Sequence, residues 1–262
     1  MMVIVGAHSL LGTHLSKKLN KENFNYLALA ASASDITQLE KQQEIQYWQL
    51  VDVDALPKWV AENAEELEFM FWCLADQSLP ENQLFTTLWQ QCYQHQIPFI
   101  FATRDQQIQD WASSQERYPF FWAGLQTGQL YGPGEEHFKE VSEVYKVIQN
   151  QLEDVSATNE ETDQLHFTYV QDVVELIYFF VRHRQHSGFY DLPQQQADVS
   201  LLQNLVIQVK NQDEAPAATP FSSQSRQEIG RLKEIGYKGH FHSLPEGIYS
   251  VVTNYLAAQR YI

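Results

Sequence analysis

Short runs of apolar residues alternate along the chain with segments whose apolar residues are spaced three or four apart. The first run, Val3–Val5, is β-branched and ends at Gly6. Leucines then recur at helical spacing, at positions 10, 11, 15 and 19. Because β-branched runs favour buried strands and a spacing near 3.6 favours amphipathic helices, this pattern predicts a strand, a loop and a helix.

The same alternation continues through the first half of the chain. Apolar runs predict further strands at Tyr26–Ala30, Tyr47–Val51, Phe69–Cys73, Pro98–Ala102 and Phe120–Leu130. Helical spacing predicts helices at Leu56–Leu67, Leu84–His95 and near Gln106–Ala112. Strands that alternate with helices in this way form parallel βαβ units. The sequence therefore predicts an α/β fold, a Rossmann-like, doubly wound parallel sheet with helices on both faces.

The second half of the chain has a less regular pattern. The polar stretch Glu153–Gln164 predicts a loop. Apolar spacing beyond it predicts a strand at Gly188–Leu192 and helices at Val170–Arg182, Leu201–Val209, Arg226–Ile235 and Pro245–Ala258. We therefore expect a Rossmann-like, nucleotide-binding-type domain at residues 1–130. Residues 131–262 are expected to complete the sheet and to form a small, mixed C-terminal lobe of the substrate-binding type.

The net charge and the cysteine content indicate which partners the protein can bind and which cellular compartment it occupies. The 262 residues include 33 acidic and 17 basic side chains, and the net charge of −16 repels nucleic acid and anionic membrane surfaces. Cys73 and Cys92 are too few for a disulfide framework, which is typical of a reducing compartment and indicates a cytoplasmic protein. No apolar run reaches the roughly 18 residues of a membrane span, and no basic stretch precedes the first strand. We therefore expect neither a transmembrane helix nor a signal peptide.

The segment GAHSLLG, residues 6–12, has the position of a phosphate-binding loop between the first strand and the first helix. In a G-x-x-G-x-x-G loop the first glycine makes the turn, the second admits the pyrophosphate and the third lets the helix pack on the strand. Gly6 and Gly12 fit the outer positions, but Ser9 adds a Cβ and a hydroxyl at the middle one. The helix N-terminus still attracts anions. Two interpretations stay open, a weakened dinucleotide site and a purely structural turn.

A second position concerns the adenosine ribose of NAD. Dinucleotide-binding folds usually hold that ribose with an acidic residue about 20 residues beyond the glycine loop. Here Ala30 and Ala31 end the second predicted strand, and no arginine nearby favours a 2′-phosphate. Asp35 comes later and fits a helix cap or a loop. Both contacts to the adenosine half are thus weakened.

Six segments spread over nearly the whole chain resemble the extended short-chain dehydrogenases/reductases, within the nucleotide-sugar epimerases and dehydratases. They are QLVDVDAL (49–56), CYQHQIPFIFAT (92–103), LYGPGEEH (130–137), HFTYVQDVVEL (166–176), SGFYDL (187–192) and IGRLKEIGYKGHFHSLPEGI (229–248). The resemblance implies a Rossmann fold, an NAD or NADP cofactor and a nucleotide-sugar ligand. It assigns the cofactor contacts to Gly6, His8, Ser9, Leu10, Leu11, Gly12, Asp52 and Val53.

The central catalytic device of that family is missing from the sequence. Its members use a Tyr-x-x-x-Lys pair, whose spacing places the ammonium beside the phenol, lowers the phenol pKa and holds the nicotinamide ribose. No tyrosine of this chain has a lysine four residues later, and Arg182 at that distance from Tyr178 fits an ordinary neighbour on a helix face. Only 16 residues, 103–118, separate the Pro98–Ala102 strand from the next apolar strand. This interval is too short for a loop and a long helix, so we infer that the catalytic helix is deleted.

At other catalytic positions, too, the residue typical of the family is replaced. The serine or threonine at the strand end falls on Arg104, and the nearest hydroxyl is that of Thr103. The arginine and asparagine that precede the YGP motif become Gln126 and Gln129. One branch of the family has a lysine directly after the YGP…H string, whereas here the lysine comes one residue late. The candidate catalytic residues are therefore Thr103, Arg104, Tyr118 and Lys139.

Two functions follow from these departures, and a third is kept open. The first is a degenerate, epimerase-like protein that binds a nucleotide, a sugar or a protein partner without redox turnover. The second is an active NAD(P)-dependent epimerase or dehydratase in which Tyr118 acts as acid/base and Arg104 lowers its pKa. The third is a reductase-like protein with a different cofactor. No metal site is expected, because His240 and His242 read as alternating residues of a strand without a cysteine or carboxylate at ligand spacing.

The resemblance also bears on assembly. Enzymes of this family often dimerise through a four-helix bundle, to which each subunit contributes the helix before the fifth strand and the tyrosine-bearing helix after it. Without the second helix, Leu84–His95 lacks its usual partner. We therefore expect a monomer, or an oligomer built on another surface.

Overall fold

The structure, a computed structural model, describes residues 1–39, 44–76, 82–105, 111, 114–115, 119–138, 141–152, 164–211 and 217–259, with the backbone alone at 37–38 and 255–259. Two compact units are formed by these residues. The first consists of Met1–Gln126 and Val174–Asp191, and the second of Thr127–Val173 and Leu192–Ile262. Most of the predicted loop at Glu153–Gln164 and most of the predicted helix near Gln106–Ala112 lie outside the described residues.

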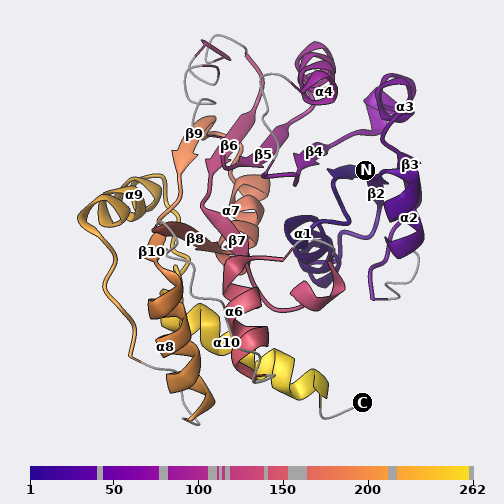
Figure 1. The fold of residues 1–262 in the computed structure, drawn as a ribbon. Helices are drawn as coiled ribbons and strands as arrows, with labels where there is room; N and C mark the ends of the chain where they lie inside the picture. The colour runs from indigo at the N-terminus through magenta and orange to yellow at the C-terminus, as the bar shows by residue number, and fades with distance from the viewer. Residues whose placement is uncertain are drawn as a thin grey trace. The chain divides into compact units, whose positions relative to one another are not determined.

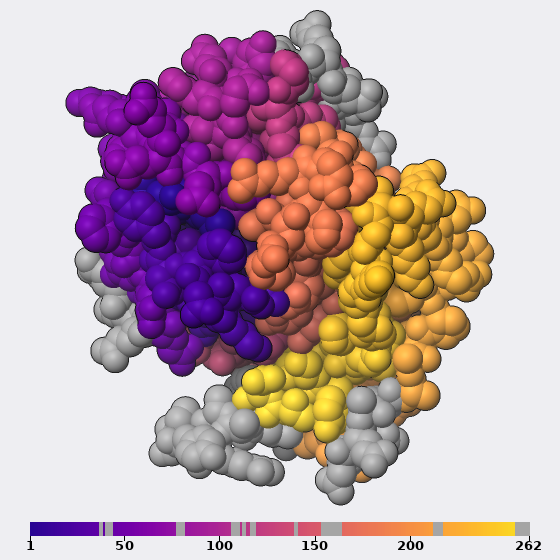
Figure 2. Space-filling view, turned by 180° about the vertical axis from the view of Figure 1, so that it is seen from behind, coloured from indigo at the N-terminus to yellow at the C-terminus, as the bar shows by residue number. Residues whose placement is uncertain are grey.

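A seven-stranded sheet forms the centre of the first unit (Figure 1). Its strands are β1 (Met2–Val5), β2 (Leu27–Ala31), β3 (Gln49–Asp52), β4 (Phe69–Trp72), β5 (Phe99–Thr103), β6 (Trp122–Gln126) and β9 (Gly188–Asp191). They follow the order β3-β2-β1-β4-β5-β6-β9, and every neighbouring pair is parallel. Figure 2 shows the orange surface of Val174–Asp191, which supplies β9, beside the indigo to magenta surface of the first half of the chain. The predicted Rossmann-like parallel sheet is confirmed.

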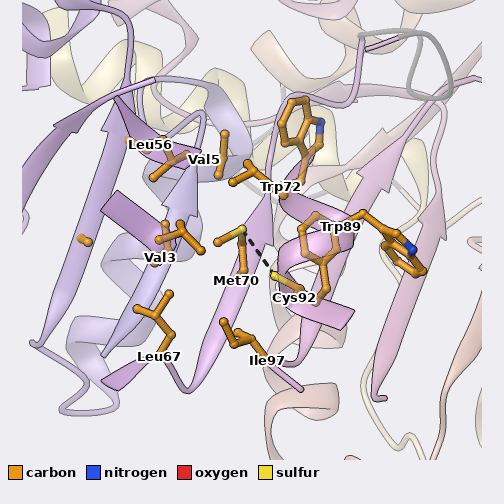
Figure 3. Packing of buried hydrophobic residues seen from close by; sticks show 14 of the residues in the cluster. Val3, Val5, Leu56, Leu67, Met70, Trp72, Trp89, Cys92 and Ile97 are labelled. Carbon is orange, nitrogen blue, oxygen red and sulfur yellow. Dashed lines mark hydrogen bonds between the residues drawn. The ribbon is translucent and has the colours of Figure 1, made fainter. Parts of the chain in front are cut away.

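Helices cover both faces of this sheet. They are α1 (Leu10–Lys21), α2 (Ala33–Leu39), α3 (Leu56–Asn63), α4 (Gln83–His95) and α7 (Val170–Arg182), with a short 3₁₀ turn η1 (Ala64–Glu66) after α3. Residues of α3 and α4 pack with alternate residues of the strands, such as Val3, Val5 and Met70, in one buried cluster (Figure 3). The Cys92 thiol of α4 donates a hydrogen bond to the Met70 sulfur at 3.8 Å. Strand alternation thus gives each face of the sheet its own helical layer.

The second unit has a smaller, mixed sheet. Its strands are β7 (Gln129–Tyr131), β8 (Leu165–Tyr169) and β10 (Gln195–Ala197), in the order β10-β8-β7. Strand β8 is parallel to β7 and antiparallel to β10. The helices are η2 (Glu135–His137), α6 (Glu143–Leu152), α8 (Val199–Lys210), α9 (Ser223–Glu234) and α10 (Leu244–Gln259). Residues of α6, α8 and α10 pack together with the strands in a separate apolar core.

Two details of the sequence-based prediction are wrong. The stretch Phe120–Leu130 is not one strand, because β6 ends at Gln126 and β7 begins at Gln129 in the other sheet. At Gly128, which lies between them, an added Cβ would be 2.5 Å from the His166 carbonyl oxygen, so this close backbone crossing requires glycine. Residues 237–243, where His240 and His242 were expected to alternate in a strand, form an irregular segment instead.

Candidate functional site

The loop between β1 and α1 is a tight turn that depends on two glycines. Gly6 adopts φ +77°, and a Cβ at this position would lie 2.6 Å from the Leu74 side chain. A Cβ at Gly12 would lie 2.2 Å from the Gly6 carbonyl oxygen, which is closer than real atoms approach. Gly6 therefore makes the turn and Gly12 lets α1 pack against it, as the loop motif requires.

Ser9 is the N-cap of α1. Its Oγ accepts a hydrogen bond from the Gly12 amide at 3.0 Å and donates one to the Cys73 carbonyl at 2.9 Å, just beyond β4. Both hydrogen bonds hold the Ser9 hydroxyl against the protein backbone. The amides of Leu10 and Leu11 are the first two of the helix and have no acceptor within it. An anion at this helix end would face these amides.

A carboxylate reaches the same loop from α2. The Oδ2 atom of Asp35 lies 3.5 Å from Nε2 of His8 and accepts a 2.6 Å hydrogen bond from the Ser32 hydroxyl. The His8 and Asp35 side chains are 25% and 17% exposed, so both border solvent. From the sequence alone, Asp35 is expected to be a helix cap or a loop residue. The signal that would have found it is Ser-x-x-Asp directly after a strand, a pattern that starts a helix and places an acid in its first turn.

Asp52 and Val53 follow β3 at the same edge of the sheet. Asp52 pairs in register with Ala31, and its Oδ1 accepts a 2.9 Å hydrogen bond from the Asp54 amide. The Val53 amide donates to the Ala31 carbonyl at 3.1 Å. The carboxyl ends of β1, β2 and β3 therefore bring together the residues assigned to the cofactor, but the Val53 amide is already used within the sheet.

The candidate catalytic residues give a different result. Thr103 is fully buried, and its Oγ1 accepts a 3.0 Å hydrogen bond from the Asp105 amide. The Arg104 guanidinium forms an ion pair with Asp76, which follows β4. Tyr118 and Lys139 lie outside the described residues. Of the four candidates, the structure therefore describes two: Thr103 is buried, and Arg104 is paired with a carboxylate.

The two glutamines that depart from the family pattern have different surroundings. Gln126 ends β6, in register with Thr103 of β5, and it is 7% exposed with no described hydrogen-bond partner for its Oε1. Gln129 lies in the second unit, where its Oε1 accepts a 3.0 Å hydrogen bond from the Glu143 amide at the start of α6. Gln129 thus has a structural role as a helix cap.

The two cysteine thiols are buried in the part of the chain that the structure covers. Burial raises the pKa of the Cys73 and Cys92 thiols, which keeps both protonated and unreactive. Within the described ranges, no group of three His, Cys, Asp or Glu side chains is placed to hold a metal ion. No described helix is long and apolar enough to span a membrane.

Comparison with known proteins finds similar chains among the epimerases. No family model matches the chain. It is 24% identical to ADP-L-glycero-D-manno-heptose-6-epimerase of Fusobacterium nucleatum subsp. nucleatum, over 99% of each chain. The resemblance to nucleotide-sugar epimerases is confirmed. The alignment with the heptose epimerase is 330 residues long, more than the 262 residues of this chain, so the relative contains stretches that this chain lacks.

Solved epimerase structures have the same fold. UDP-glucose 4-epimerase of Thermus thermophilus, in complex with NAD, superposes with a TM-score of 0.67 at 16% identity, covering 98% of this chain and 100% of that one. UDP-N-acetylglucosamine 4-epimerase of Methanobrevibacter ruminantium, in complex with UDP-N-acetylmuramic acid, gives a TM-score of 0.72 at 14% identity, with 98% of each chain covered. At these identities the likeness establishes the fold and leaves the chemistry to be argued from the residues.

Proposed function

We propose that this chain binds a nucleotide, either NAD(P) or a nucleotide sugar, at the carboxyl edge of its parallel sheet, without the hydride transfer of an epimerase. The observation that carries the proposal is a contrast between two halves of one site. The turn for the pyrophosphate is intact at Gly6 and Gly12, whereas the residues for nicotinamide chemistry are lacking in sequence. The chain thus retains a means of binding and lacks the means of turnover.

The intact half fits the pyrophosphate of a dinucleotide. Gly6 and Gly12 close the turn, and the amides of Leu10 and Leu11 would bind the phosphate oxygens at the helix N-terminus. Asp35 is the carboxylate placed to accept hydrogen bonds from a ribose at the ends of β1 and β2. UDP-glucose 4-epimerase of Thermus thermophilus and the enzyme WbmF of Bordetella bronchiseptica, which have this fold, have been solved in complex with NAD, and this supports the assignment.

The other half lacks the groups that the cofactor needs for hydride transfer. NAD(P), when bound, supplies a hydride acceptor, and the protein must supply a base for the substrate hydroxyl and a cation for the nicotinamide ribose. No Tyr-x-x-x-Lys pair exists in the sequence, and the interval of 16 residues after β5 is too short for the helix that carries it. The longer alignment with the heptose epimerase supports such a deletion. Arg104, the candidate substitute cation, is neutralised by Asp76.

The expected affinity is low. Three positions differ from a full dinucleotide site: the middle glycine is Ser9, the second strand ends in Ala30 and Ala31 so that Asp35 of α2 takes the ribose contact instead, and the lysine is missing. Each lost hydrogen bond to a charged or buried group costs roughly 1.5 to 3 kcal/mol. Two such losses move a micromolar site into the millimolar range.

Titration calorimetry with NAD, NADP, ADP-ribose and UDP-glucose, paired with an assay for epimerisation and for reduced nicotinamide, tests both parts of the proposal. We expect weak binding, in the range of about 0.1 to 10 mM, and no turnover. Epimerised sugar, or reduced cofactor formed with a nucleotide sugar, would restore the alternative of an active enzyme with substitute residues. Arg104→Ala and Tyr118→Phe would then show which side chains act. A chain that binds none of these ligands at 10 mM would overturn the binding half.

We also propose that the chain is a monomer or assembles through a surface other than the family's helix bundle. The reason is that the interval of 16 residues after β5 is too short for the long tyrosine-bearing helix that would pair with α4 across a dimer axis. Light scattering during gel filtration tests this, and a dimer that dissociates when the exposed face of α4 is made charged would contradict it.

A further inference from the structure

A cavity of about 620 Å³ lies in the first unit, at the edge opposite to the loop described above. Pro98 precedes β5, Phe121 precedes β6 and Gly188 begins β9, so the cavity borders the amino-terminal ends of three neighbouring strands. The nucleotide loop lies at the carboxyl ends of the same sheet. Since strands rise about 3.3 Å per residue, five-residue strands such as β5 and β6 keep the two edges about 15 Å apart. The cavity is therefore a separate place on the molecule.

An arginine that lies over an aromatic ring lines this cavity. The Arg184 guanidinium lies 4.3 Å from the centre of the Phe69 ring, and Phe69 is fully buried in β4. Among the described residues no carboxylate pairs with Arg184, although the chain has 33 acidic residues and only 17 basic ones. A guanidinium that stacks on an aromatic ring keeps the N–H groups along its edge available for an anion.

A second donor lies three residues away. The Ser187 Oγ accepts a 3.2 Å hydrogen bond from the Trp122 amide, so its own O–H can donate into the cavity. The next residue, Gly188, has φ +145°, and an added Cβ there would meet no atom within 4 Å. The turn between α7 and β9 thus presents a cation and a hydroxyl beside open space.

The remaining lining residues are apolar except for Gln96, and they include Pro98 and Phe121. Pro98 is buried and Phe121 is half-buried. The Phe121 ring packs edge-on against Phe69, with centroids 6.4 Å apart, and against Phe180 at 6.5 Å, so its orientation is held by buried neighbours. Such a surface favours a planar ring over a flexible aliphatic chain.

We propose that this cavity binds a planar aromatic anion, with its carboxylate on Arg184 and Ser187 and its ring against Pro98 and Phe121. A carboxylate matches the fork of guanidinium donors, and the added hydroxyl serves a remaining lone pair. The volume falls within the range of small-molecule sites. The proposed nucleotide binding does not require this cavity, so each proposal can be tested independently of the other.

Titration calorimetry with 1-naphthoate, its neutral isostere 1-naphthamide, and acetate tests the proposal. We expect 1-naphthoate to bind at least tenfold more tightly than either of the others, because each lacks one of the two recognised features. Raising the salt concentration from 20 to 300 mM should weaken 1-naphthoate binding. Equal binding of the acid and the amide, or no binding of 1-naphthoate at 10 mM, would overturn the assignment.

Substitutions test whether Arg184 binds the carboxylate of 1-naphthoate. Arg184→Met keeps the side-chain length but removes the charge, and we expect it to weaken 1-naphthoate binding at least tenfold. Arg182→Met is the matched control, since Arg182 lies two residues away, donates to the Tyr178 hydroxyl at 3.4 Å and does not line the cavity. If Arg184→Met does not fold, Ser187→Ala provides a milder test, with an expected loss of about threefold. If the variant that folds, Arg184→Met or Ser187→Ala, binds 1-naphthoate as tightly as wild type, the proposed binding role of the turn between α7 and β9 is refuted.

Discussion

Ser9 offers the most direct test of how the glycine loop is held together. Its hydroxyl forms two hydrogen bonds, one from the Gly12 amide at 3.0 Å and one to the Cys73 carbonyl at 2.9 Å. Ser9→Ala removes both while keeping the Cβ. Loss of an N-cap costs about 1 kcal/mol, and loss of a neutral, partly buried hydrogen bond costs about another 1 kcal/mol. The free energy of unfolding should therefore fall by about 2 kcal/mol.

This magnitude is measurable by urea denaturation followed by tryptophan fluorescence, since Trp72 ends β4 immediately before Cys73. The thermal midpoint should fall by about 4–8 °C, at roughly 2–4 °C per kcal/mol for a chain of this size. Ser9→Thr is the matched control, because threonine keeps the Oγ and caps helices almost as well, and it should stay within about 0.5 kcal/mol of wild type. A Ser9→Ala variant as stable as the control would refute the reasoning.

Three further predictions concern packing and titration. Gly12→Ala should destabilise the chain by about 3 kcal/mol, seen as a lower urea midpoint, because its Cβ would lie 2.2 Å from the Gly6 carbonyl oxygen. Burial raises the pKa of Glu135 from 4.5 to about 7, so the folded state binds its proton more tightly than the unfolded chain and stability falls as the pH rises through this range, by up to about 3 kcal/mol. Urea unfolding of Glu135→Gln should lack this pH dependence, and parallel curves for both proteins would contradict the assignment. The hydrogen bond that the His242 imidazole donates to the Asp172 carboxylate raises the pKa of His242, so the contribution of His242 to stability is present below pH 6.5 and is lost as the pH rises through its folded pKa. His242→Gln should therefore lower the thermal midpoint more at pH 6 than at pH 9, and an equal loss at both would exclude a charged pair.

The central strands could be predicted from the sequence because burial on both faces leaves a continuous apolar run. Predicted runs at Val3–Val5, Phe69–Cys73 and Pro98–Ala102 lie within one or two residues of β1, β4 and β5, which are fully buried. The glycine loop was also predictable, since the turn at Gly6 and the helix contact at Gly12 require glycine for local steric reasons.

The short strands of the second unit could not be predicted in this way. Strand β10 has three residues, Gln195–Ala197, two of them glutamines, and β8 has polar residues among its five. Such segments have little preference of their own, and they become strands because β8 pairs with both β7 and β10. The break in Phe120–Leu130 has the same origin, since the crossing at Gly128 is set by a backbone that comes about 40 residues later.

By itself, the sequence determined the parallel sheet, the glycine loop and the absence of a Tyr-x-x-x-Lys pair, because these depend on residue types at fixed local spacing. Only the tertiary structure decided which charges meet. Asp35 approaches His8 across two strand ends, Arg104 pairs with Asp76, and Arg184 stacks on Phe69 from more than 100 residues away. Partners this far apart in sequence are brought together by the order of strands in the sheet, and no local pattern encodes that order.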